Sequence, residues 1–128
     1  MKNIVKTLAL SGILFASLAN AEVQLKDNAE ILGKWNLYAE AIKLDGEKKA
    51  VKTEWDFQPD GTLQTTSTDS VGRTKEMKIA IKYAVENGSI KKQATPGREK
   101  YDICNVIEKD DHSMTLKCSG MFFFLKKL

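Results

Sequence analysis

The chain has 128 residues and a formal net charge of +3, and 29% of its residues are charged. Positive and negative side chains are interspersed along the sequence, which excludes a cationic stripe of the kind that follows a phosphate backbone, so we expect no nucleic-acid partner. The length suits a single domain and excludes two.

Residues 1–21 have the pattern of a cleaved export signal. Two lysines precede the apolar stretch 7–18, and Ala19-Asn20-Ala21 then supplies the small residues that signal peptidase requires. A membrane anchor is the alternative, but this stretch is shorter than the roughly 20 apolar residues that cross a bilayer. We therefore expect a mature chain that begins at Glu22, is periplasmic or secreted, and contains no transmembrane segment.

The mature chain, residues 22–128, is nearly neutral. The signal carries two lysines and no acidic residue, so its removal lowers the net charge from +3 to +1. Residues 22–128 contain no internal repeat, linker or low-complexity segment, which indicates one domain.

A short helical turn is predicted at the start of this domain. Asp27 followed by Glu30 has the spacing of a capping box, and Gly33 stands where a helix would stop. The pattern predicts a helical turn over Asn28 to Leu32 that covers one end of the domain.

Closely spaced turn signals divide the rest of the chain into eight short segments. Between the signals, apolar and polar residues alternate, as in 51–57 and 77–85, which is the period of a strand with one buried face. Asn-Gly and Asp-Gly between such runs indicate tight hairpins. The seven signals are Asp45-Gly46, Pro59-Asp60-Gly61, Asp69 to Gly72, Asn87-Gly88, Pro96-Gly97, Asp110 to His112 and Ser119-Gly120.

Eight strands joined by short turns form an antiparallel meander, which buries one apolar face most completely by closing on itself. The fold class that we predict is therefore all-β: an eight-stranded antiparallel up-and-down barrel with a short N-terminal helical turn. The first strand, Lys34 to Lys43, would meet the last strand, Met121 to Lys127, and close the barrel.

Both cysteines fall in the mature chain, and an oxidising compartment favours a disulfide over two free thiols or a metal site. The runs 101–107 and 114–118 flank a polar turn, and pairing them symmetrically about residue 111 sets Cys104 opposite Cys118. The same register sets Val106 opposite Leu116, so the bridge would share an apolar face.

The residues that open the first strand resemble a known signature. Gly33-Lys34-Trp35 after a helical turn is similar to the Gly-x-Trp motif of lipocalins and of their short bacterial lipocalin-like relatives. The stretch Trp55 to Leu63 is similar to the second hairpin of the bacterial domains, and Met114 to Lys117 with an aromatic last strand is similar to their ending. The resemblance spans about residues 32–127 and implies a lipocalin-like barrel domain.

The resemblance also implies how the barrel base closes. In lipocalins the signature tryptophan packs on a cation from near the chain end, so this role falls to Gly33 and Trp35, with Lys126 or Lys127 as the cation. The family usually places an arginine there, but the last arginine of this chain is Arg98. A lysine makes a poorer planar stack.

Seven residues are predicted to face the barrel interior. They would either line a cavity for an apolar ligand, with a tyrosine hydroxyl as an orienting group, or fill the barrel as an ordinary core. The chain is shorter than an ordinary lipocalin and lacks the long helix that follows the barrel, so the cavity would be narrow and shallow. The seven are Trp55, Phe57, Leu63, Met77, Ile79, Ile81 and Tyr83.

The sequence offers no arrangement suited to catalysis. His112, the only histidine, lies in a polar turn beside Asp110 and Asp111, where such residues are expected in any case. The same turn with Met114 nearby offers metal-binding groups, but the spacing matches no closed site and Met114 should point into the core. We therefore expect that the protein is not an enzyme and that it binds no metal ion or cofactor.

The run Phe122-Phe123-Phe124 must turn at least one aromatic side chain outward, because a strand alternates its faces. The outward ring marks a contact surface or covers the neighbouring hairpin. The favoured function is a non-catalytic lipocalin-like binding protein of the cell envelope that holds a small apolar or amphipathic ligand. The alternative is a protein-interaction module, such as an envelope inhibitor or accessory subunit, with a filled barrel.

Overall fold

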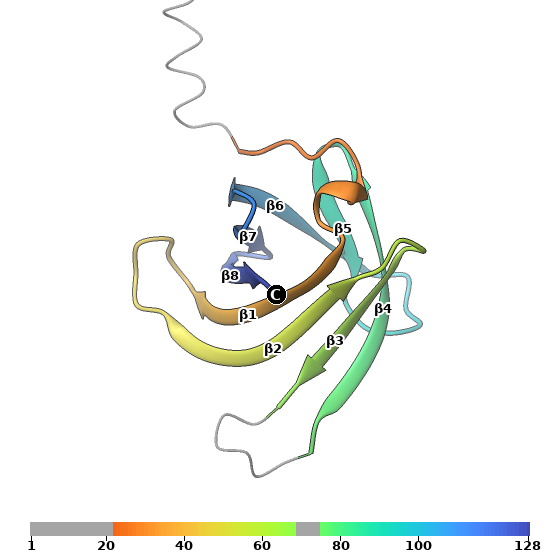
Figure 1. The fold of residues 1–128 in the computed structure, drawn as a ribbon, viewed down its shortest axis with the longest axis horizontal. Coiled ribbons are helices and arrows are strands. Elements are labelled where there is room, and N and C mark those ends of the chain that lie inside the picture. The colour runs from red at the N-terminus through yellow and green to blue at the C-terminus, as the bar shows by residue number, and fades with distance from the viewer. Residues whose placement is uncertain (1–21, 69–74) are drawn as a thin grey trace, which may run out of the picture.

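The computed structural model describes residues 22–68 and 75–128, and the predicted export signal lies outside these residues. The strands form a closed barrel in chain order, and each is antiparallel to its neighbours (Figure 1). The predicted eight-stranded up-and-down barrel is therefore confirmed. Its elements are the 3-10 turn η1 (Asn28–Glu30) and the strands β1 (Gly33–Ala41), β2 (Lys49–Phe57), β3 (Thr62–Ser67), β4 (Met77–Glu86), β5 (Ser89–Gln93), β6 (Tyr101–Lys109), β7 (Ser113–Cys118) and β8 (Met121–Lys127).

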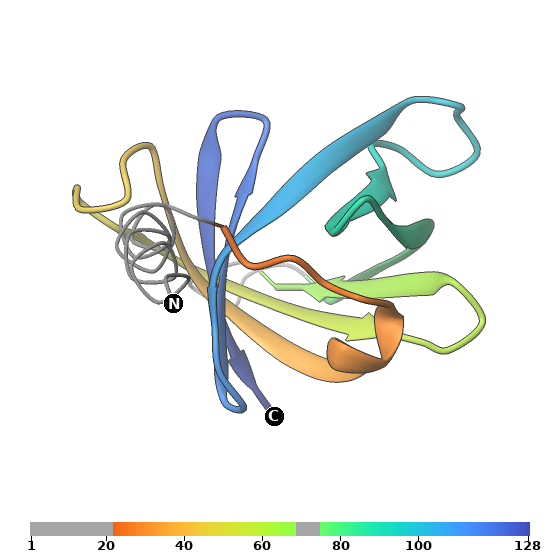
Figure 2. The ribbon, with the colours of Figure 1, turned by 90° about the horizontal axis from the view of Figure 1, so that it is seen from above.

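The pairing of β1 with β8 closes the barrel. Trp35 lies opposite Lys127, and Leu37 lies opposite Leu125. Figure 2 shows β7 and β8 crossing β1 and β2 steeply, as the strand tilt of a closed sheet requires. β1 ends at Ala41 rather than at Lys43, because residues 42–48 leave the sheet as the β1–β2 loop. Within the described ranges, no helix has the length and apolar character needed to span a membrane.

A β-bulge divides β1 into two parts. Its register shifts between Leu37 and Ala39 against both β2 and β8. A shift of one residue exchanges the two faces of a strand. Beyond the bulge, Glu40 lies opposite Phe123, which packs against the core, while Ala39 turns to the outer face.

The disulfide forms in the predicted register. Cys104 lies opposite Cys118 and Val106 opposite Leu116, and all four side chains are buried. The bridge joins β6 to β7 on the inner face of the sheet, where its sulfur atoms belong to the main core cluster. The prediction of a disulfide is therefore confirmed.

The base of the barrel is covered by the chain that precedes β1. The Asp27 carboxylate caps η1 by accepting a hydrogen bond from the Ala29 amide at 3.0 Å. The indole Nε1 of Trp35 donates to the Ile31 carbonyl at 2.9 Å, and the Ile31 side chain is fully buried. The helical turn is shorter than predicted, because it ends at Glu30.

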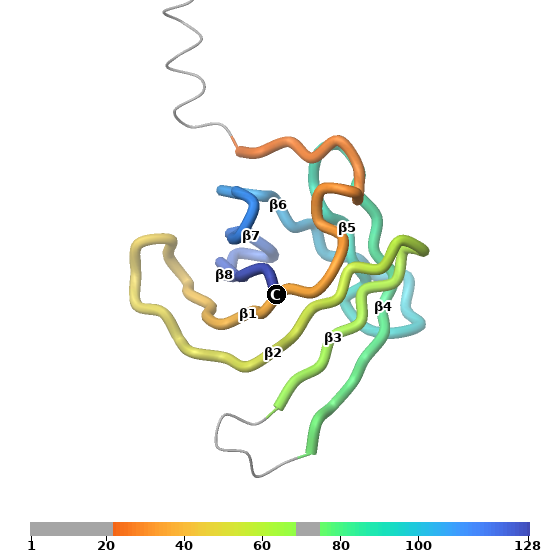
Figure 3. The backbone as a smooth tube through the Cα atoms, viewed as in Figure 1, coloured from red at the N-terminus to blue at the C-terminus, as the bar shows by residue number. Residues whose placement is uncertain are grey.

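The first described residues also cover this end of the molecule. Figure 3 traces them across β6 toward the β4–β5 turn. The Val23 amide donates to the Val106 carbonyl at 2.8 Å, and the Leu25 amide donates to the Gly88 carbonyl at 3.0 Å. Leu25 is buried in the core, so this segment seals the base from a second side.

Lys127 is the cation that packs on Trp35. The resemblance allowed Lys126 or Lys127, and the structure places the Lys127 ammonium 4.9 Å from the Trp35 ring centroid, where it also donates to the Leu32 carbonyl. Burial, with a smaller effect from Lys109, lowers the pKa of Lys127, although Asp56 partly offsets this. Lys126 instead lies over Tyr38 at 5.3 Å, because adjacent residues of β8 point to opposite faces.

Gly33 makes room for this ammonium. Its φ is +107°, and a Cβ atom there would lie 2.5 Å from Lys127 Nζ. A side chain at residue 33 would therefore adopt a strained backbone and displace the cation from the tryptophan.

We expect the disulfide to contribute strongly to stability. The variant C104A/C118A should lower the free energy of unfolding by about 3 kcal/mol, because the bridge closes a loop of about 15 residues in the unfolded chain. Urea unfolding followed by circular dichroism measures this loss. A reductant should reproduce it in the unmodified protein and have no effect on the variant; equal stability of the two proteins would contradict the prediction.

We expect Gly33→Ala to destabilise the barrel more than Gly97→Ala. Both glycines have positive φ, so each substitution introduces strain of about 1–3 kcal/mol, but a Cβ atom at Gly97 meets nothing within 4 Å. Because both variants share the backbone strain, the difference between their melting temperatures in thermal unfolding measures the cost of displacing Lys127. Equal losses in both would mean that backbone strain alone accounts for the glycine at residue 33.

Candidate functional site

The part of the barrel interior next to the base is filled by side chains. Trp55, Phe57 and Leu63 are buried in one core cluster. The Phe57 ring packs edge-on against Trp55 and Tyr83, with centroid separations of 6.0 and 5.0 Å. None of five pockets of about 210 to 530 Å³ on the described residues is lined by Trp55, Phe57 or Leu63. A role for these three residues in ligand contact stays a prediction.

The burial of the other four predicted interior residues falls toward the start of β4. Ile81 and Tyr83 are buried, and Ile79 is partly buried against the core. Met77 shares the inner face with Ile79 and Ile81 but is 61% exposed, so it lies outside the packed core, and its role as cavity lining stays a prediction. It begins β4 and pairs with Ser67, the last residue of β3, where the two strands project beyond the packed core (Figure 1).

The Tyr83 hydroxyl serves the base of the barrel. It donates to the Gln58 carbonyl at 2.7 Å and accepts from the Asn28 side-chain amide at 3.4 Å. Burial raises the pKa of Tyr83, and the bond from Asn28 offsets part of this rise. These contacts tie η1 to the β2–β3 turn, so the Tyr83 hydroxyl stabilises the base of the barrel.

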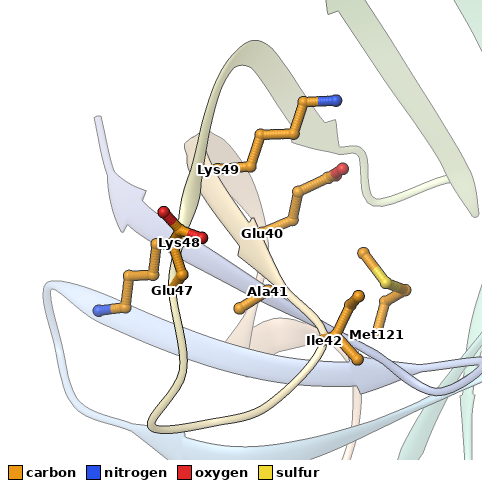
Figure 4. Close-up of a pocket in the computed structure, with 7 residues that line it drawn as sticks. All are labelled: Glu40, Ala41, Ile42, Glu47, Lys48, Lys49 and Met121. Carbon is orange, nitrogen blue, oxygen red and sulfur yellow. The ribbon is translucent and has the colours of Figure 1, made fainter.

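A pocket lies at the opposite end, which we call the mouth: the end of the barrel that carries the β1–β2 loop and the β7–β8 turn. Its volume is about 530 Å³, within the range of small-molecule sites. Figure 4 shows the side chains of Ile42 and Met121 pointing into the same space as those of Glu40 and Lys49. The lining residues are Glu40, Ala41, Ile42, Glu47, Lys48, Lys49 and Met121.

The bulge in β1 sets the chemistry of this pocket. Glu40 lies on the inner face, directly opposite Lys49 of β2 and Phe123 of β8. The ion pairs among the described residues, at 3.6 to 3.9 Å, join other side chains, and none links Glu40 to Lys49. The mouth therefore holds an acid and a base side by side, next to apolar groups.

The mouth exposes large apolar side chains among its charged ones. Ile42 is 74% exposed and Leu44 is 43% exposed, and both lie in the β1–β2 loop. Met77 adds a third exposed apolar side chain at the same end of the barrel, because the β3–β4 connection also lies there. Of these exposed apolar side chains, that of Ile42 also lines the pocket, so it is placed to contact a ligand there.

The aromatic run of β8 divides between two faces. Phe123 packs against the core, with its ring 6.1 Å from that of Trp55, as the alternation of a strand requires. Phe122 and Phe124 form an outer cluster with Tyr38, Ala39 and Ala41. Lysines cover these rings. The Lys48 ammonium lies 4.3 Å from the ring centroid of Phe124, and the Lys117 ammonium lies 5.6 Å from that of Phe122. Phe124 is only 6% exposed, so the outward rings offer less free surface than an open contact site would.

The polar β6–β7 turn is held together by the side chain of Asp110. The Asp110 carboxylate accepts hydrogen bonds from the amides of His112 and Ser113, each at 2.8 Å. Both bonds lower the pKa of Asp110, and the bond from the His112 amide has the larger effect. Met114 is buried beneath the turn. Across residues 22–68 and 75–128, His, Cys, Asp and Glu form no group of three or more that would hold a metal ion.

The sequence reasoning did not identify Glu40, Lys49, Ile42 and Met121 as a site. Strict alternation along β1 places Glu40 outside and Ala39 and Ala41 inside, and the bulge reverses this order. The adjacent apolar residues Leu37 and Tyr38 interrupt the alternation, and they were the only sign of the bulge in the sequence.

Comparisons with known proteins bear on the fold. A lipocalin-like protein from Bacteroides uniformis has a similar structure, with a TM-score of 0.63 and 18% sequence identity over 77% of this chain and 99% of that chain. An uncharacterized protein from Bacteroides eggerthii matches with a TM-score of 0.60 and 18% identity, over 76% of this chain and 98% of that chain. No protein-family model and no curated protein matches the sequence. The likeness in structure, together with the closed antiparallel barrel, identifies the fold of this chain as lipocalin-like.

Proposed function

We propose that this chain is a non-catalytic binding protein that holds a small amphipathic molecule in the mouth of its barrel. The observation that carries the proposal is the pocket of about 530 Å³ above a filled core, with apolar and charged groups on its walls. A pocket of this kind takes a ligand with an apolar part and a polar part. The ligand lies at the mouth, because the aromatic rings below it already occupy the interior.

The lipocalin-like fold supports a binding role, whereas the site itself supplies the choice of ligand class. Ile42 and Met121 offer apolar contact, and Glu40 and Lys49 offer charged groups. The pocket lacks a nucleophile paired with a base: its charged groups are two glutamates and two lysines, and the only histidine lies in the β6–β7 turn. These features favour binding over catalysis.

A second candidate is the protein-interaction module, and the filled interior favours it. In that case the outer cluster of Tyr38, Phe122 and Phe124 would contact an envelope protein. Aromatic side chains are common in the centres of protein interfaces. The rings are already covered by lysines, so we rank this role second.

Export of the chain is part of the proposal. The signal pattern of residues 1–21 and the disulfide both suit an oxidising compartment, the periplasm or the exterior of the cell.

Binding at the mouth is testable by NMR titration with decyl maltoside, a probe with a neutral head group and a single alkyl chain. We expect Ile42→Ser to weaken probe binding about tenfold, because contact with one isoleucine side chain contributes about 1.4 kcal/mol when it is partly buried. Ile103→Ser is the matched control, since Ile103 is also exposed but lies in β6, away from the pocket. Equal effects of the two substitutions, or no effect of either, would place the probe elsewhere and count against a site at the mouth.

Export is testable by expressing the whole 128-residue chain in a bacterial host. We expect the protein in the periplasmic fraction to begin at Glu22 and to have a mass two hydrogens below that of the reduced chain, because cleavage follows Ala21 and the cysteines are oxidised. Intact mass spectrometry measures both features. The variant A19R/A21R should remain unprocessed, and an unprocessed wild-type chain would contradict the proposed signal.

A further inference from the structure

We infer that the mouth selects a zwitterionic amphipath, whose cationic group faces Glu40 and whose anionic group faces Lys49, with its apolar part against Ile42 and Met121. This inference rests on the proposed function and names the head-group chemistry of the ligand. It is carried by a pair of opposite charges that share one face of one hairpin at the opening of the barrel.

The two charged groups are neighbours on adjacent strands. Glu40 is directly opposite Lys49 in the β1–β2 pairing. In Figure 4 both side chains extend into the pocket from the same side of the hairpin. Opposite side chains of a pair have Cβ atoms about 4.5–5.5 Å apart, so a ligand with two charges separated by a few bonds can reach both.

The other charged groups of the pocket leave this pair available. Lys48 lies over the Phe124 ring, which belongs to the outer cluster, so its ammonium is held outside the mouth. Glu47 lies further along the β1–β2 loop, where it also lines the pocket. The Glu40 carboxylate and the Lys49 ammonium lie more than 4.0 Å apart, so these two groups do not form an ion pair with each other.

A balanced pair of charges disfavours ligands that carry a single charge. A simple anion would gain from Lys49 but would meet the carboxylate of Glu40, and a simple cation would meet the opposite conflict. Like charges held close together oppose binding, so the pair acts as a filter as well as an anchor. A zwitterion satisfies both groups at once.

The apolar part of the ligand must be short or must lie along the rim. Phe123 sits beside Glu40 on the inner face and packs against Trp55, which closes the way into the barrel. Ile42 and Leu44 extend the apolar surface outward from the pocket. A single alkyl chain can lie on this surface, whereas a bulky ring system that requires a deep cavity cannot enter.

The test compares four probes that share a decyl chain and differ in head group: decylphosphocholine (zwitterionic), decyltrimethylammonium (cationic), decanoate (anionic) and decyl maltoside (neutral). Each is titrated below its critical micelle concentration into the disulfide-bonded protein, residues 22–128, and the shifts of the backbone amides of residues 40–49 and 121 are followed by NMR. We expect decylphosphocholine to bind most tightly.

Substitutions in the pair should separate the head groups. Glu40→Gln should weaken decylphosphocholine and decyltrimethylammonium about two- to fivefold, the range for partly exposed charge pairs, and should not weaken decanoate. Lys49→Gln should weaken decylphosphocholine and decanoate by a similar factor. Neither substitution should alter binding of decyl maltoside, which reports the apolar contacts alone.

Two variants of the same hairpin serve as controls. Glu54 and Lys52 lie in β2 with the opposite orientation to Lys49, so Glu54→Gln and Lys52→Gln change the same charges outside the pocket and should leave all four affinities unchanged. Equal affinities for the four probes, unaffected by any variant, would overturn the zwitterion inference and leave the binding function standing. Failure of all four probes to shift the mouth residues would overturn the proposed function itself.

Discussion

The pairing of β1 with β8 is the constraint on which the rest of the molecule depends. It converts a meander into a closed barrel, and it brings Lys127 to the tryptophan of the first strand and to the backbone before it. The base is therefore held by contacts between the two ends of the domain. Because closure also fixes the width of the barrel, the bulky rings of β2 and β4 pack together in the interior, and the pocket of about 530 Å³ opens at the mouth instead.

The bulge in β1 allows one strand to serve both ends of the barrel. Before the bulge the inner face carries Trp35 and Leu37, which pack in the core. After it the inner face carries Glu40, and the small side chains Ala39 and Ala41 are covered on the outer face by aromatic rings. A single extra residue thus changes the lining from apolar to charged along the same strand, which is how a stable base and a polar opening coexist in a short chain.

Much of the fold could be predicted from the sequence because it follows from local rules. Turn residues and alternation located the strands, and symmetry about one turn gave the register of Cys104 with Cys118. The site could not be found in this way. The alternation that placed Trp55 and Phe57 on the inner face placed Met77 there too, but periodicity shows which face a residue occupies and not how far along the barrel the packed core extends. Choosing Lys127 over Lys126 required the register of β8, and locating Glu40 required the bulge.

The position of the pocket relative to the packed core bears on how such a chain can change over generations. The β1–β2 loop is exposed along its whole length and contributes no side chain to the core clusters. Lengthening a loop raises its closure entropy only slowly, by about 0.6 kcal/mol for each doubling. Insertions and substitutions in this loop can therefore alter the shape and charge of the opening while the base, the disulfide and the aromatic core keep the barrel folded. Descendants of one such barrel can diverge in what they recognise long before they diverge in architecture.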